Sequence, residues 1–312
     1  MNAIARIAQS VLVLFLAYVF VFLILSVLPG DPITNRLSDP DSGLTRQAAD
    51  ALIGYYGLDR PTHVQFVDTL VNALRGDFGR SLIDGKPVTE KLIEALPSTL
   101  ALAGSALLAA VVLAVVVSLL AVYGRWPFLR AIGNALPSFS LAVPSYIFAL
   151  LLIQVFSFQL HWFVSVGDHG AESLVLPAIA LGIPVSAPLA QVFTDSIRQR
   201  VRDPFVTVSR ARGLGEVRIF ITGLLKVSSL PALTVLGLAV GTLIGGAVIT
   251  ESVFGRAGLG SLVQKSVAQQ DLPVLQAIVL LSALVFLVVN LVVDLVYPAL
   301  DPRIRSSRTV AV

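Results

Sequence analysis

Three histidines are the first residues whose side chains could bind a metal or transfer a proton. They are His63, His161 and His169, and the chain has no cysteine. None has a second ligand at the i, i+4 spacing of a helical zinc motif such as His-Glu-x-x-His. Without cysteine, thiol catalysis, disulfides and cysteine-ligated metals are excluded. The sequence therefore predicts no catalytic residue and no metal site, and we expect the histidines to lie at a surface.

A glycine-rich stretch at residues 79–87 comes close to a phosphate-binding loop. It reads Gly-Arg-Ser-Leu-Ile-Asp-Gly-Lys-Pro. The spacing between its glycines is one residue too long, and Pro87 stands where a serine or threonine would bind magnesium. The chain also lacks the Gly-x-Ser-x-Gly turn of a serine nucleophile. We therefore expect a protein that is not an enzyme and carries no cofactor of its own.

The elements that position these residues are strongly apolar. Hydrophobic residues make up 56% of the 312 residues and charged residues 13%, whereas about a quarter of a soluble domain is charged. The net charge of +3 is too small and too dispersed for a nucleic-acid-binding protein, which needs a clustered basic face. The composition predicts an integral membrane protein.

Six stretches without Asp, Glu, Lys or Arg are long enough to cross a bilayer, which takes about 20 apolar residues. They are residues 7–30, 95–124, 131–160, 173–194, 227–250 and 272–293. The first is longer than the apolar part of a signal peptide, so we interpret it as a retained helix. The sequence thus predicts an all-α integral membrane protein with six transmembrane helices, divided into an N-terminal helix (1–30), an extracytoplasmic loop region (31–94), a five-helix core (95–300) and a tail (301–312).

The basic residues orient these spans. With the N-terminus inside, the core's largest loop, residues 195–226, lies in the cytoplasm and carries many arginines, whereas the short outer loops carry Arg256 and Lys265. Basic residues favour the cytoplasmic side, so both termini are predicted to be cytoplasmic. In the outer region, a short amphipathic helix is indicated by apolar residues at helical spacing, namely Val64, Val67, Leu70, Val71 and Leu74.

Asp294 interrupts the last apolar stretch. A charge in the bilayer costs about 3 kcal/mol, so such residues are functional candidates. A proton-driven carrier would need a relay of these groups, and one Asp near the interface is poor support for it. The alternative is an anchor that pairs with a base such as Arg303 or reaches the lipid headgroups.

Glycines and prolines alter helix packing in the third to fifth spans. Gly237, Gly241 and Gly245 recur every four residues and Gly246 adjoins them, so one helix face has almost no side chains and another helix can approach it closely. The third and fourth spans contain prolines, which free backbone carbonyls that protein or a wet cavity must satisfy: Pro137, Pro144, Pro177, Pro184 and Pro188. Together these residues predict a bundle that lines a path.

The cytoplasmic loop contains a short helix pattern. Asp203 suits a helix cap, Pro204 the first helical position and Gly213 the stop. Ser209 and Ala211 are small, and they alternate with Arg210 and Arg212 in a stretch that also contains apolar residues. Small side chains would let this helix approach another protein closely. Two interpretations are open: a basic loop that touches anionic lipid, or a short helix that enters a groove of another protein.

At this loop the sequence resembles the EAA loop of ABC-importer permeases, in the subfamily that includes the dipeptide, oligopeptide and nickel permeases. It departs from the family's usual residues at Ser209 (alanine), Gly223 (histidine) and Ser228 (asparagine). The likeness covers nearly the whole chain, and its motifs occur in the family's order: LPGDP at 28–32, YGLDRP at 56–61, GDFGRS at 76–81, LPSTL at 96–100, GGAVITESVF at 245–254, GLG at 258–260, and NLVVD and LDPRIR at 290–294 and 300–305.

The resemblance implies a type I ABC importer permease fold and a transport subunit in the bacterial plasma (inner) membrane. The chain would be the first of two paired permeases and form half of a heterodimeric path for dipeptides or oligopeptides. Its partners would be a second homologous permease, two ABC ATPase subunits that hold ATP and Mg, and an extracytoplasmic substrate-binding protein. The same importer type could instead carry nickel chelates, haem or another small molecule. A proton-driven carrier using Asp294, and a receptor with residues 31–94 as its ligand domain, are the rival classes.

By this likeness, site residues fall in three groups. The helix that couples the permease to the ATPases carries Phe205, Val206, Ser209, Arg210, Ala211, Arg212, Gly213, Leu214 and Gly215. Helix packing at the permease core involves Gly237, Gly241, Gly245 and Gly246, and a possible gate or path involves Glu251 and Phe254.

Overall fold

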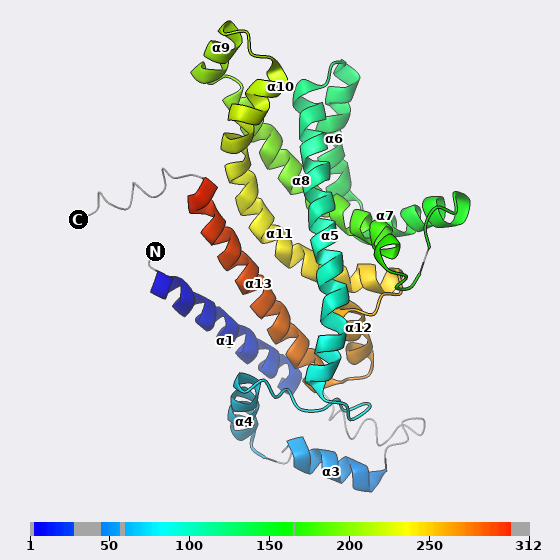
Figure 1. Cartoon of the computed structure of the whole chain (residues 1–312). Helices are drawn as coiled ribbons and strands as arrows, with labels where there is room; N and C mark the ends of the chain where they lie inside the picture. Colours follow the sequence, from blue (N-terminus) through cyan, green and yellow to red (C-terminus); the bar gives the residue numbers. More distant parts are fainter. Residues whose placement is uncertain (1–2, 28–44, 57–59, 165, 301–312) are drawn as a thin grey trace, which may run out of the picture. The chain divides into compact units, whose positions relative to one another are not determined.

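The computed structural model describes residues 3–27, 45–56, 60–164 and 166–300, and these residues are predominantly helical (Figure 1). The longer helices are α1 (Ala3–Val27), α5 (Val88–Tyr123), α6 (Pro127–Ala142), α8 (Val175–Arg200), α11 (Leu225–Val253) and α13 (Leu272–Leu300). The shorter ones are α3 (Arg46–Tyr56), α4 (Thr62–Leu74), α7 (Ser145–Leu152), α9 (Pro204–Ala211), α10 (Glu216–Ile219) and α12 (Leu259–Ala268). Two π-helical segments, Ile153–Gln159 and Phe220–Leu224, and a 3-10 turn, Ala171–Leu174, complete the described elements.

Four of the described helical segments are long and apolar enough to cross a membrane. They are Val88–Tyr123, Ala171–Arg200, Glu216–Val253 and Leu272–Val292. A bent pair of helices would make a fifth span, and the apolar part of α1, Ala8–Ile24, is shorter. The structure thus shows an all-helical membrane protein with four to five apolar spans in its described residues, and the expected six helices stay a prediction.

The third expected span, residues 131–160, is not one straight helix. α6 ends at Ala142, Val143 is extended (φ −99°, ψ 124°), and α7 begins after Pro144. Proline disfavours the helical conformation of the residue before it, and the two helices meet at a bend of 106°. Pro137, Pro184 and Pro188, by contrast, remain inside their helices.

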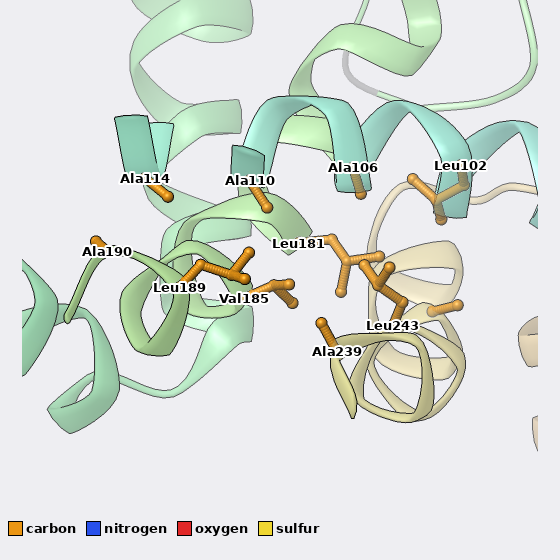
Figure 2. Close-up of a cluster of buried hydrophobic side chains, with 11 residues drawn as sticks. Leu102, Ala106, Ala110, Ala114, Leu181, Val185, Leu189, Ala190, Ala239 and Leu243 are labelled. Atoms are coloured by element: carbon orange, nitrogen blue, oxygen red, sulfur yellow. The ribbon is translucent and has the colours of Figure 1, made fainter. Parts of the chain in front are cut away.

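The contacts divide the chain into two compact units, Met1–Thr99 with Ala257–Leu287, and Leu100–Arg256 with Val288–Val312. In the second unit, α5, α8 and α11 form the core (Figure 2). α5 presents Leu102, Ala106, Ala110 and Ala114, one residue from each turn. These pack against α8 and α11 through Leu181, Val185, Leu189, Ala190, Ala239, Leu243 and Ala247. The small residues let the helix backbones approach closely, which is a main source of association in lipid.

Glycines outside the predicted stripe make the closest approaches to α5. A Cβ on Gly133 of α6 would lie 2.5 Å from the Ala121 nitrogen, and one on Gly182 of α8 would lie 3.0 Å from the Ala106 oxygen. Both neighbouring atoms belong to backbone, which cannot move aside easily. These two positions therefore require glycine because of close packing.

In the first unit, α1 and α4 pack against the N-terminal part of α13. The buried residues Tyr18, Phe22 and Leu280 form a cluster with Phe66 and Leu70 of α4. The Tyr18 hydroxyl donates a hydrogen bond to the Phe66 carbonyl at 2.7 Å. The amphipathic helix predicted in the outer region is confirmed as α4, whereas the neighbouring α3 was not anticipated.

Candidate functional site

The short helix predicted in the loop of residues 195–226 is α9. It begins at Pro204 after an extended Asp203, as the sequence pattern predicts, and it ends at Ala211. The Asp203 side chain makes no capping hydrogen bond; its carboxylate lies 3.4 Å from the Arg200 guanidinium. The start of α9 is therefore set by the fixed φ of proline rather than by a side-chain cap.

The end of α9 depends on Gly213. Its φ is +78°, a left-handed conformation that costs other L-residues about 1–2 kcal/mol. The Gly213 amide donates to the Arg210 carbonyl at 2.9 Å and the Leu214 amide to the Ser209 carbonyl at 3.1 Å, which is the Schellman pattern of helix ends. This turn sends the chain back toward α10.

A small apolar core holds the loop together. Val206, Ile219 and Leu224 are buried in it, and Leu214 and Phe220 pack against them. Val206 and Leu214, two predicted coupling residues, therefore fix α9 onto its own loop. The remaining predicted residues lie on the surface or half-buried: Phe205, Ser209, Arg210, Ala211, Arg212, Gly213 and Gly215.

Apolar side chains are exposed beside these residues. Phe205 and Val208 of α9, Val217 of α10 and Ile221 of the π segment all face solvent in part. Exposed apolar residues gathered in one part of a surface typically mark an interaction site. Val217 and Ile221 were not predicted, although their i, i+4 spacing just after Gly215 was a visible signal.

Phe205 also explains an unusual glycine. A Cβ on Gly223 would lie 2.8 Å from Cε2 of the Phe205 ring. The ring therefore occupies the space that a side chain at residue 223 would need. At this position the resembling family commonly has histidine, and a side chain here would have to displace the partly exposed Phe205 ring.

Two of the loop's arginines, Arg210 and Arg212, differ in their partners. Arg210 donates two hydrogen bonds to Glu216, Nε to Oε1 at 2.6 Å and Nη2 to Oε2 at 3.1 Å. These bonds raise the pKa of the Arg210 guanidinium further above its ordinary value. Arg212 is exposed and, within the described part of the chain, forms no ion pair. Arg212 is thus a positive charge that is available to another molecule, as are the exposed Arg202 and Arg218.

The glycines of α11 do not share one contact. Gly237 is buried, and a Cβ on Gly246 would lie 2.5 Å from Cδ1 of Leu181 on α8. Gly241 and Gly245 are exposed, with nothing within 4 Å of a Cβ on Gly245. The structure therefore places Gly237 and Gly246 inward and leaves Gly241 and Gly245 open on the surface of this chain.

The two proposed gate residues lie at the end of α11 and are buried, Glu251 completely and Phe254 almost so. Phe254 packs with residues of α7 and α8. The next turn contains Arg256, whose guanidinium donates to Asp168 Oδ2 at 3.0 Å and to Ser173 Oγ at 3.2 Å. Nothing in the local sequence pairs Arg256 with residues more than 80 positions away, so this clamp could not be predicted.

A second buried polar cluster lies in the first unit and joins residues 79–91 to the start of α13. The stretch 79–87 forms a tight hairpin, in which Arg80 and Pro87 make a bridge. Ser81 Oγ donates to Oδ2 of the buried Asp271 at 2.5 Å, and the Leu82 amide donates to its Oδ1 at 3.0 Å. Lys91 Nζ lies 2.9 Å from Ser81 Oγ and 3.0 Å from Asp84 Oδ1. We call these residues (Ser81, Leu82, Asp84, Lys91, Asp271) the outer clasp.

The charges of the outer clasp influence one another. Partial burial acts to raise the pKa of Asp84, but the hydrogen bonds from Lys91 and the Lys86 amide outweigh it and hold the pKa below its ordinary value. In the described residues, no group of three His, Asp or Glu side chains could hold a metal ion. Asp294 lies in α13, but its side chain is outside the described residues, as is Arg303.

Comparison with known proteins gives a consistent set of relatives. Residues 110–306 match the family described as "Binding-protein-dependent transport system inner membrane component". The chain is 34% identical over 294 residues to "Glutathione transport system permease protein GsiC" of Salmonella choleraesuis, covering 94% of both chains. It is also 34% identical over 304 residues to the protein of that name from Escherichia coli strain K12, covering 97% of this chain and 98% of the relative.

Solved structures share the fold at low sequence identity. One, described as inward-facing conformations of the MetNI methionine ABC transporter, is 17% identical with a TM-score of 0.55 and covers 67% of this chain and 95% of that chain. Another, an amino acid ABC transporter with histidines, is 19% identical with a TM-score of 0.52 and covers 68% of this chain and 94% of that chain.

Proposed function

The chain belongs to the binding-protein-dependent transport system inner membrane components, as an ABC-importer permease of the peptide and nickel subfamily, and we propose that it forms half of a translocation path for peptides. A peptide cargo is supported by the likeness to glutathione permeases over at least 94% of the chain. Glutathione is a tripeptide, so dipeptides and short oligopeptides have its size and chemistry. Nickel chelates and haem are the competing cargoes.

The proposed assembly has the chain as one of two paired permeases. Two ABC ATPases with ATP and Mg would dock on the cytoplasmic side, and a binding protein would deliver peptide from outside. Both termini would be cytoplasmic. The chain would consist of an N-terminal transmembrane helix (1–30), an extracytoplasmic loop region (31–94), a five-helix core (95–300) and a cytoplasmic tail (301–312). The chain would alter no bond of its cargo.

The loop around α9 is proposed as the contact with an ATPase. Its apolar core fixes α9 in place, while Phe205, Val208, Val217 and Ile221 expose apolar surface and Arg212 offers a charge. ATP-driven closure of the ATPases would push on residues 203–216 and rock the helices behind them. The exposed Gly241 and Gly245 would allow close approach of a helix from the paired permease, and Glu251 and Phe254 would act at the gate.

Reconstituted complexes in liposomes test this proposal. Wild type should take up labelled glutathione or dipeptide only with ATP and all partner subunits. Arg212→Glu should lower ATP-coupled uptake by about tenfold, because a charge at an interface is reversed, while Arg125→Glu, an exposed arginine of the short loop before α6, should leave it unchanged.

Three outcomes would contradict parts of the proposal. Equal uptake by both variants would remove the coupling role of α9. Uptake by the purified single chain along a proton gradient would favour a carrier that uses Asp294. ATP-coupled uptake of a nickel chelate or haem but not of peptide would keep the importer and change its cargo.

A further inference from the structure

An apolar cavity of about 430 Å³ lies beside α4 in the first unit. Its walls come from α1, α4 and α13 and include Val11, Phe15, Ala73, Leu74, Leu281 and Leu284. The volume is within the roughly 300–1,000 Å³ of typical ligand sites. Because its walls are almost entirely apolar, the part of a ligand that fits there is hydrocarbon.

The cavity opens on the side where lipid is expected. Val11 is 62% exposed, Leu74 is 80% exposed and Phe15 is also exposed, although all three line the cavity. The outer face of α1 continues from there with further exposed apolar residues, among them Leu12, Leu16 and Phe20. Acyl chains would cover such a face in a membrane, so we expect the cavity to be continuous with a lipid-facing surface.

A polar pocket lies on the other side of the same helix. It has a volume of about 520 Å³ and is lined by Arg60, Asp68, Asn72, Arg75 and Asp77, among others. Phe78 lines both this pocket and the apolar cavity. Arg60 pairs with Asp68 at 3.0 Å, whereas Arg75 is exposed at the end of α4. A pocket with both signs of charge next to an apolar cavity matches a ligand with a phosphate head and a hydrocarbon tail.

We propose that α4 and its two flanking pockets bind a membrane phospholipid, with an acyl chain in the apolar cavity and the phosphate at Arg75. α4 also exposes Val67, Val71 and Leu74 in one stripe, as helices that lie in the membrane interface do. The inference rests on the proposed function in one respect, that α1 lies in the bilayer. The bound lipid would fix α4, and with it the hairpin that follows, at the outer surface.

The probe is a phosphatidylethanolamine with a photoreactive diazirine on one acyl chain, in vesicles of phosphatidylethanolamine and phosphatidylglycerol that contain the full chain. Illumination should label peptides of α1 and α4. Ala73→Leu, which fills the cavity, should lower this labelling by about tenfold, the effect of a modest loss of affinity. Ala232→Leu is the matched control, because Ala232 lines a separate apolar cavity in the other unit, and it should change nothing at α1 and α4.

The head group is tested separately with a diazirine diacylglycerol, which lacks the phosphate. Wild type should label better with the phospholipid than with the diacylglycerol, and Arg75→Gln should remove this preference. Arg46→Gln, an exposed arginine of α3, should keep it. Because Arg75 is on the surface, its variant remains informative even if Ala73→Leu does not fold.

Labelling spread evenly over all apolar helices, or unchanged in Ala73→Leu and Arg75→Gln, would overturn the inference. Labelling that disappears when the purified binding protein is added would assign this face to a protein partner instead. Uptake is measured in parallel, in vesicles of the same lipids that contain the complete complex with its partner subunits and ATP. ATP-coupled uptake without specific labelling would contradict the lipid site alone, and specific labelling without uptake would contradict the proposed function alone.

Discussion

The outer clasp and the α9 loop both rely on charged side chains, but they place them differently. The outer clasp buries Asp271 under Ser81 and Leu82, with Lys91 nearby. The α9 loop keeps its ion pair, Arg210 with Glu216, at the surface and exposes apolar side chains beside it. A buried, fully bonded carboxylate holds its own chain together, whereas an exposed mixture of charge and apolar surface is available to another chain. We therefore expect the outer clasp to determine stability and the α9 loop to determine coupling.

The largest expected effect comes from Asp271→Ala. It leaves Lys91 without its buried partner and the Leu82 amide without its acceptor, which costs about 3 kcal/mol. The melting temperature of the purified chain in detergent should fall clearly. Asp195→Ala, at an exposed carboxylate 3.8 Å from Arg198, is the control and should have little effect. A melting temperature equal to that of wild type would break the contrast between the two regions.

Gly213→Ala is expected to have the next largest effect. No atom lies within 4 Å of the new Cβ, so the cost of about 1–2 kcal/mol comes from the left-handed backbone alone. This should loosen the turn after α9 and reduce ATP-coupled uptake more than it reduces the melting temperature. Gly215→Ala is the matched control, because its surroundings are equally open but its φ is −70°. Equal uptake by both variants would show that the turn at Gly213 has no role in coupling ATP hydrolysis to transport.

Acid should weaken the outer clasp through Asp84. The pKa of this carboxyl is lowered in the folded chain, so its contribution is present above the unfolded pKa of about 4 and is lost as pH falls through the lower folded value. At pH 7, Asp84→Asn should melt at a lower temperature than wild type, and the difference should shrink below about pH 4. Asp50→Asn, at an exposed position in α3, serves as the comparison. A difference that persists at low pH would show that the carboxylate's charge is not the cause.

The smallest effect on stability is expected from Arg210→Gln. The bonds to Glu216 are short, but both side chains are close to half exposed, and exposed ion pairs contribute little. The melting temperature should be unchanged while ATP-coupled uptake falls. A drop in melting temperature as large as that of Asp271→Ala would show that the α9 loop, too, is built around its ion pair.

Local patterns predicted the elements that depend on local chemistry. The helix start at Pro204, the Gly213 stop and the helix with Val64, Val67 and Leu70 all appear in the structure, because the fixed φ of proline, a glycine stop and helical spacing act within a few residues. The expected cap by the Asp203 side chain does not form. Pro144 was one of five prolines expected to kink the helices, but the sequence did not indicate which of them breaks its helix. That depends on the neighbours, and Pro184 remains inside α8.

Contacts between distant residues were the main omission. In the sequence, residues 79–87 resemble a phosphate-binding loop with the wrong spacing. In the structure they form a hairpin whose Ser81 hydroxyl donates a hydrogen bond to Asp271, 190 positions away. The glycine stripe of α11 indicated close packing, yet the glycines that meet the backbone of α5 from α6 and α8 are Gly133 and Gly182. A single sequence contains no information on which small residue meets which helix.

The alanine-rich face of α5 has a mechanical consequence. Ala106, Ala110 and Ala114 present only methyl groups on this face, Gly182 of α8 approaches it with bare backbone, and the larger side chains at the contact, Leu181, Val185 and Leu189, come from α8. Packed helices that change position slide past each other in small steps. The face of α5 therefore offers few ridges of its own that would oppose a small shift of α8.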